Sequence, residues 1–212
     1  MDDPIIAARG WRQVAALFAA VALVAPAAPR AIQRDLGTED LQRAIKIGGS
    51  SEAERARFHS AYIFPLRVDD PAIQQLEVLT EFRRVVIEAN DRLRKGDHMF
   101  GAGQADLAIR PWHNKLTLVL RLRFHPQNVL VTVPPYELAI GEPGPTPLDA
   151  RRMPVYSLTG TGQRPGTPTP MYGATVEADF DVAAVRPGPQ TVRVVLERKE
   201  LARATINFAQ ID

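Results

Sequence analysis

The stretch LRLRFHPQNVLVTV, residues 120–133, carries an apolar side chain at every second position before a four-residue turn signal, and again after it. Proline at position 126 presets φ for the second position of a type I turn over 125–128. If this turn closes a β-hairpin, register and hydrophobic pattern agree, because all six paired side chains fall on one face. The predicted pairs are Phe124 with Val129, Leu122 with Val131 and Leu120 with Val133.

The two-residue period extends through the C-terminal half of the chain. It begins at Leu107 and Ile109 and returns over 136–140, 174–182 and 192–208, between segments rich in glycine and proline. Short alternating strands separated by such turns are typical of an antiparallel β-sandwich. We therefore expect residues 97–212 to form a sandwich.

The last two predicted strands, 192–196 and 202–208, have apolar side chains that face each other only if an odd number of residues connects them. A hairpin specified in this way predicts a three- or five-residue loop within 197–201.

Helical signals precede the strands. Thr38 is placed to cap a short helix, and Ser51 and Glu54 have the spacing of a capping box. Thr80 begins the strongest predicted helix, which Gly96 ends. Its apolar residues form one stripe, expected to pack on the sheet, made of Phe82, Val85, Val86, Ala89 and Leu93. These signals therefore predict that residues 38–96 form a helical N-terminal part packed on the sandwich.

The first 27 residues have the pattern of a secretory signal peptide. Arg9 and Arg12 precede the apolar run 14–25, and Ala25-Pro26-Ala27 offers a small-residue cleavage site. The alternatives are an apolar helix of the fold and an uncleaved anchor. The run is shorter than the roughly 20 residues that cross a bilayer. We expect a periplasmic or secreted protein with a flexible tail over 28–37 and no stable membrane span once the leader is removed.

Composition excludes several classes of site. The chain has 212 residues, a formal net charge of +2 and no cysteine, which rules out disulfides, thiolate metal sites and cysteine nucleophiles. Acidic and basic residues are interspersed, so no basic arm predicts a nucleic-acid partner.

The C-terminal strands resemble the closing strands of immunoglobulin-like and fibronectin type III-like domains. The residues that carry this resemblance are Phe180, Val185 and the run Pro187-Gly188-Pro189-Gln190-x-Val192-x-Val194. It covers about 35 residues, and Gln190 stands where these folds often place a tyrosine that makes the tyrosine corner. The resemblance implies an Ig-like β-sandwich.

Two groups of charged residues are candidate binding residues. Arg121 and Arg123 share one face of a predicted strand, where they could meet an acidic strand or an anionic ligand. Glu177, Asp179 and Asp181 share a face of another strand, which predicts either a solvated surface or a calcium site completed by a loop. The four histidines have no metal-ligand spacing, and no nucleotide-binding or nucleophile-elbow motif is present. We expect no cofactor and no metal.

Two proline-rich segments, 141–154 and 160–170, flank a short predicted strand at 155–158 and are long enough to be either mobile or functional loops. The leading functional hypothesis is a non-catalytic envelope module that binds an envelope protein or polymer. The competing hypothesis is a secreted hydrolase whose site lies between these loops and the 81–95 helix. A third is a ligand or metal sensor that uses the arginine or acidic face.

Overall fold

The computed structural model describes residues 32, 35–68, 70–156 and 171–212. The predicted leader, most of the predicted tail and the proline-rich segment 160–170 lie outside the described residues. Within the described ranges, no helix is long and apolar enough to cross a membrane.

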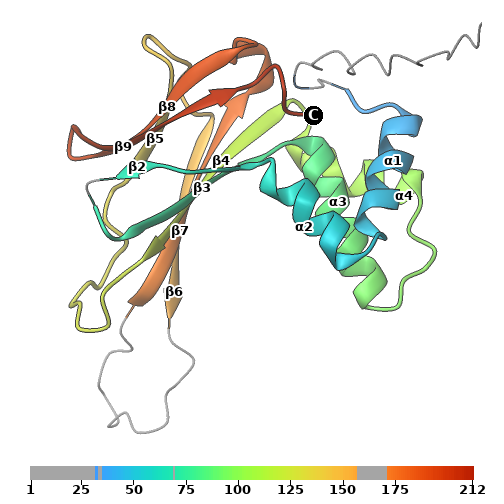
Figure 1. The fold of residues 1–212 in the computed structure, drawn as a ribbon, viewed down its shortest axis with the longest axis horizontal. Coiled ribbons are helices and arrows are strands. Elements are labelled where there is room, and N and C mark those ends of the chain that lie inside the picture. The colour runs from blue at the N-terminus through green and yellow to red at the C-terminus, as the bar shows by residue number, and fades with distance from the viewer. Residues whose placement is uncertain (1–31, 33–34, 69, 157–170) are drawn as a thin grey trace, which may run out of the picture.

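The described residues form four α-helices, which gather at one end of the molecule (Figure 1): α1 (Thr38–Gly48), α2 (Glu52–Ser60), α3 (Glu81–Arg94) and α4 (Ala102–Ile109). The first three were predicted, although Thr38 is the first residue of α1 and Gly37, not Thr38, stands at its N-cap. At α2, the capping box is present, with the side chains of Ser51 and Glu54 bonding reciprocally to backbone amides. At α3, the Thr80 hydroxyl accepts from the Arg83 amide, and Gly96 follows the last turn at φ +83°.

Helix α4 lies in a segment whose alternation of Leu107 and Ile109 predicted a strand, so that prediction was wrong. The residues that decide it are Ala105 and Ile109, four apart and buried on one helical face, while Leu107 is 55% exposed. Three and four residues are the spacing of neighbours on a helix surface. The buried pair joins α1 and α3 in a separate helical core.

The strands form two antiparallel sheets. Sheet A has the order β1-β3-β4-β7-β6, made of β1 (Ile63–Phe64), β3 (Ile73–Leu79), β4 (Lys115–Arg123), β7 (Met171–Asp181) and β6 (Asp149–Tyr156). Sheet B has the order β2-β9-β8-β5, made of β2 (Arg67–Val68), β9 (Lys199–Asn207), β8 (Pro189–Leu196) and β5 (Glu137–Ile140). Two short 3-10 helices, η1 (Arg110–Trp112) and η2 (Val182–Ala184), precede β4 and follow β7.

The two sheets share one hydrophobic core. Its fully buried side chains come from both sheets and from the segment after β9, and include Leu76, Leu118, Leu120, Phe180, Ile206 and Phe208. The helical core is a second cluster, and Phe58 of α2 packs against both. The apolar stripe of α3 faces α1 and α4 in that second cluster, so the expectation that it packs on the sheet was wrong. Arginines of α3 face the sheet instead.

The predicted hairpin over 120–133 does not form. Leu120 is buried as predicted, but it pairs with Leu76 of β3 on one side and Val176 of β7 on the other. Both edges of β4 are therefore occupied, and residues 129–133 form no strand. Val129 and Val131 are 91% and 81% exposed. Alternation establishes that a segment is a strand, but it does not choose the partner, and β7 supplies a longer register, from Lys115↔Asp181 to Arg123↔Gly173.

The turn over 125–128 is present, since the Asn128 amide donates to the His125 carbonyl at 2.9 Å. Beyond it, the Asn128 side chain donates to the Met171 carbonyl at 2.9 Å and accepts from the Leu130 amide at 3.0 Å. These bonds direct the chain away from β4. The apolar residues that follow, 136–140, then join sheet B through β5.

The β8–β9 connection keeps the predicted odd parity but not the predicted loop. Only Glu197 and Arg198 connect the strands, and both have positive φ, 50° and 69°. The register shifts by one residue next to Val194 and Val195. A two-residue turn plus one bulged residue gives the odd count that the facing side chains require.

The proline-rich segment 141–154 is in part strand, because β6 begins at Asp149 and includes the predicted strand residues Val155 and Tyr156. Pro154 is tolerated because β6 is an edge strand, where a missing N–H costs no ladder bond on the open side. Strand β3 was not predicted, because its register shifts between Ile73 and Gln75 and its buried apolar residues Ile73 and Leu76 therefore stand three apart in the sequence.

Candidate functional site

The outer face of sheet A, which carries most of the predicted site residues, is covered at one end by α3. Thr117 and Val119 on that face are 0% and 1% exposed, whereas the Arg121 side chain further along β4 is 54% exposed. The face therefore changes from buried to open along β4. Two networks of charged side chains fill the buried end.

The first network centres on Glu77 of β3. Its carboxylate accepts from Arg83 of α3 at 2.8 Å and from Arg121 of β4 at 2.9 Å. Arg83 also donates to the Val78 carbonyl at 2.7 Å, and its Nε lies 3.4 Å from Nδ1 of His59. The side chains of Arg83 and Glu77 are only 5% and 9% exposed. This network joins α3 to the first strands of the sheet.

Burial and charge act in opposite directions on these groups. Burial alone would raise the pKa of Glu77, but the hydrogen bond from Arg121 and the charge of Arg83 lower it below its ordinary value. Burial lowers the pKa of Arg83, against the favourable charge of Glu77. Burial and then the charge of Arg83 lower the pKa of His59. The folded chain therefore holds Glu77 ionised and His59 neutral.

The second network runs across β4, β7 and β6. Arg84 of α3 donates to the Thr117 hydroxyl at 2.6 Å, and that hydroxyl donates to Asp179 at 2.6 Å. The other oxygen of Asp179 lies 3.0 Å from Arg151 of β6, which also pairs with Glu177 at 3.2 Å. Asp179 and Glu177 are thus both paired with Arg151.

Trp112 of η1 lies against both arginines of this second network. The guanidinium carbon of Arg84 is 3.7 Å from the centre of a Trp112 ring, and that of Arg151 is 5.1 Å away. Burial lowers the pKa of Arg84 to about 10, although Asp179 and Glu177 raise it in part. Arg84 remains charged at neutral pH.

The structure separates the five predicted binding residues. Glu177 and Asp179 lie in one network with Arg151, whereas Arg121 forms its ion pair with Glu77 and contacts β7 only through the Thr175 hydroxyl, at 3.5 Å. Arg123 lies over the ring of Tyr172 at 5.2 Å. Asp181 accepts from the Ala183 amide at 2.8 Å and caps η2. Across the described ranges, no group of three or more histidine, aspartate or glutamate side chains is placed to hold a metal ion.

One histidine lies beside an acid. Nδ1 of His113 is 3.1 Å from Glu81, whose other oxygen accepts from the Asn114 amide at 2.6 Å. Burial raises the pKa of Glu81, while the bonds from Asn114 and His113 act against that shift. Asn114 has φ +57°. Glu81 therefore ties the turn before β4 to the first turn of α3.

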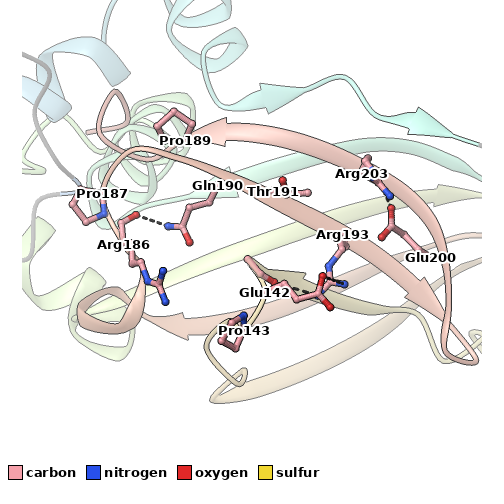
Figure 2. Close-up of a pocket in the computed structure, with 11 residues that line it drawn as sticks. Glu142, Pro143, Arg186, Pro187, Pro189, Gln190, Thr191, Arg193, Glu200 and Arg203 are labelled. Atoms are coloured by element: carbon pink, nitrogen blue, oxygen red, sulfur yellow. Dashed lines mark hydrogen bonds and ion pairs between the residues drawn. The ribbon is translucent and has the colours of Figure 1, made fainter.

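A groove of about 470 Å³ lies on the outer face of sheet B (Figure 2). Three arginines line it: Arg186 before β8, Arg193 on β8 and Arg203 on β9. Arg193 and Arg203 are directly opposite each other in the antiparallel register. Figure 2 draws Glu142, from the segment after β5, between Arg186 and Arg193. Sequence reasoning missed this site, although both strand arginines stand at the outward positions of alternating strands.

The arginines of the groove have unequal partners. Arg193 pairs with Glu142 at 3.3 Å and donates to the Gly141 carbonyl at 3.1 Å. Arg203 pairs with Glu200 at 2.6 Å. No described acid forms an ion pair with Arg186. The backbone carbonyl of Arg186 accepts a hydrogen bond from the Gln190 side chain. The groove is thus polar, positively charged and only partly neutralised.

A comparison of the chain with family models, curated proteins and solved structures finds no match.

Proposed function

We propose that the chain is an exported, non-catalytic binding module of the cell envelope, built on an Ig-like β-sandwich with a helical part at one end. The observation that carries the proposal is a contrast between the two outer faces. On sheet A, buried acids and arginines neutralise each other, as in Glu77 with Arg83 and Asp179 with Arg151. On sheet B, an open groove presents arginines that are only partly paired.

The Ig-like assignment draws support from the entrance to β8. There the Gln190 side chain donates to the Arg186 carbonyl, four residues upstream. A tyrosine corner in Ig-like domains makes a side-chain bond back to upstream backbone in the same way. The amide of Gln190 thus does at this corner what a phenol does in those domains.

Export draws support from the leader pattern of residues 1–27. The test is a fusion of the chain to a reporter enzyme that is active only outside the cytoplasm. We expect reporter activity with the leader intact and its loss in Phe18→Arg, since a charge interrupts the apolar run. Phe58→Arg, which places a charge outside the leader, is the control for misfolding and should leave export intact. Reporter activity that survives Phe18→Arg would contradict export through this leader.

The hydrolase alternative has one observation in its favour. Asp149, Glu177 and Asp179 converge on Arg151 of β6, which lies over the same Trp112 side chain as Arg84 of α3. The purified chain and Asp179→Asn are compared on ester, glycoside and peptide substrates. The binding proposal expects no turnover by either protein. Turnover that Asp179→Asn abolishes while folding is retained would overturn it.

Binding itself is tested on washed envelope material. We expect the chain to be retained, and retention to fall in Arg193→Ala but not in Arg94→Ala, which removes an exposed arginine at the end of α3. An exported chain that washes away completely would contradict a binding role.

A further inference from the structure

We propose that the groove on sheet B is a binding site for a ligand that carries carboxylate groups, and that Glu142 occupies the ligand's position in the unliganded chain. This inference names the ligand chemistry of the proposed binding module and so rests on that function. The argument comes from the three arginines of the groove and from the exposure of Glu142.

The placement of Arg193 opposite Arg203 lowers the stability of the fold when no ligand is bound. Side chains directly opposite on antiparallel strands have Cβ atoms about 4.5–5.5 Å apart, and like charges in that position destabilise the sheet. One glutamate reduces the repulsion at each arginine: Glu142 pairs with Arg193, and Glu200 pairs with Arg203. A pair of guanidinium groups held close together is favourable when an anion binds to both, because each offers a planar fork of donors to a carboxylate.

Arg193 keeps donor capacity in reserve. One terminal nitrogen pairs with Glu142 and the other donates to the Gly141 carbonyl, so its orientation is fixed from the segment after β5. Its Nε is buried and has no hydrogen-bond partner within the described part of the chain. The donors open to a ligand are those of the terminal nitrogens, because each carries two N–H groups and makes only one of these two contacts.

Glu142 is held weakly enough to be displaced. Its side chain is 80% exposed, whereas that of Arg193 is 25% exposed. An ion pair with so exposed a partner contributes little to stability, since water and salt screen it and the side chain loses entropy on pairing. A ligand carboxylate can therefore replace that of Glu142 at small cost to the fold.

The size of the groove and its remaining residues set the class of ligand. A volume of about 470 Å³ lies within the range of small-molecule sites. Arg186, with no ion pair to a described acid, offers a second anchor on the other side of Glu142, and Gln190 and Thr191 line the same groove. Two or more carboxylates on one small ligand, or on neighbouring acidic side chains of a peptide, fit this arrangement. We assign carboxylate rather than phosphate because a carboxylate is the group that Arg193 already holds.

The test is isothermal titration calorimetry on the full chain with three probes: citrate, an N-acetylated and C-amidated triglutamate peptide, and inorganic phosphate. We expect citrate or the peptide to bind, and the tighter of the two identifies a free polycarboxylate or acidic side chains as the source. Arg193→Ala should weaken binding by about tenfold or more, the loss that removal of a charge-assisted hydrogen bond produces. Arg94→Ala should leave it unchanged.

The distinguishing variant is Glu142→Gln. Removing the competing carboxylate should tighten binding by a factor of about three, since surface ion pairs have small energies. Glu52→Gln, on exposed α2, makes the same change in net charge. Equal tightening in both would mean that only net charge matters and would overturn the role of Glu142.

The other outcomes are also decisive. Phosphate that binds more tightly than both carboxylate probes would overturn the assignment of the ligand. Absence of binding by all three would overturn the inference, while retention on envelope material would leave the proposed function standing. If Arg193→Ala fails to fold by circular dichroism, Arg186→Ala serves in its place, since that side chain pairs with no described acid.

Discussion

Glu77→Gln tests the charged layer between α3 and sheet A. The change keeps the shape of the side chain and removes its charge, which leaves the guanidinium of Arg83 buried, 5% exposed, without a counter-charge. Breaking a buried ion pair by removing one partner costs about 3–5 kcal/mol, chiefly because the remaining charge is uncompensated. The loss of the bond to Arg121 adds little, because that side chain is 54% exposed.

The assay is urea unfolding followed by circular dichroism and tryptophan fluorescence at neutral pH. Glu137→Gln, at an exposed position of β5, is the matched control and should change the free energy of unfolding by no more than about 0.5 kcal/mol. Adding Arg83→Met to Glu77→Gln should cost about 0.5–3 kcal/mol less than the sum of the single changes, because the two residues act in one network.

The same variant has a pH signature. The folded pKa of Glu77 lies below its ordinary value, so its contribution is fully present above the unfolded pKa and is lost as pH falls through the folded pKa. The gap in stability between the unchanged chain and Glu77→Gln should therefore close in acid. A cost below about 1 kcal/mol at neutral pH, or a gap that is independent of pH, would refute the reasoning.

Three further outcomes are expected from chemical denaturation. Gly173→Ala should destabilise by more than about 2 kcal/mol, because its Cβ would stand 2.3 Å from the Leu122 carbonyl oxygen, whereas Gly103→Ala in α4, with no atom within 4 Å, should stabilise by about 0.5–1 kcal/mol. Leu120→Ala should lower the free energy of unfolding by about 2–5 kcal/mol and Val131→Ala by less than about 0.5 kcal/mol. Equal losses would support the predicted hairpin, in which both residues are buried. His59, whose pKa the fold lowers, should make the chain lose stability as pH falls below about 6.5, and His59→Gln should lack that slope.

Sequence reasoning succeeded where the signals are local. The capping box of Ser51 and Glu54 and the cap at Thr80 involve residues three apart, and both are present in the structure. The prediction that the alternating leucines of β4 share one buried face was also correct. These features depend on the propensities of neighbouring residues and on one buried face, which a single sequence contains.

Sequence reasoning failed where the partner of a segment is distant. Nothing in residues 120–133 shows that β3 and β7 occupy both edges of β4 and leave Val131 at the surface. Two apolar residues, Leu107 and Ile109, are too few to distinguish a strand from a helix. The segment is a helix because Ala105 and Ile109 pack against the neighbouring helices. In both cases, packing between elements overrode the local pattern.

The candidate sites show the same division. Glu177 and Asp179 were identified as acids on one strand face, but their partner Arg151 lies in a segment interpreted as a loop, so the network was missed. The pairing of Arg193 with Arg203 depends on the bulge next to Val194, which parity alone does not locate. Strand register determines which charged residues are in contact. That register depends on packing between elements that are far apart in the sequence.

The most direct measurement of the central claim, that sheet B carries the binding site, is the titration of the isotope-labelled chain with citrate or the triglutamate peptide, whichever binds more tightly, followed by amide NMR shifts. We predict saturable changes confined to β8, β9 and residues 141–143, with the largest at Arg193, and their loss in Arg193→Ala. Saturable changes on the outer face of sheet A, or shifts that persist in Arg193→Ala, would contradict the account.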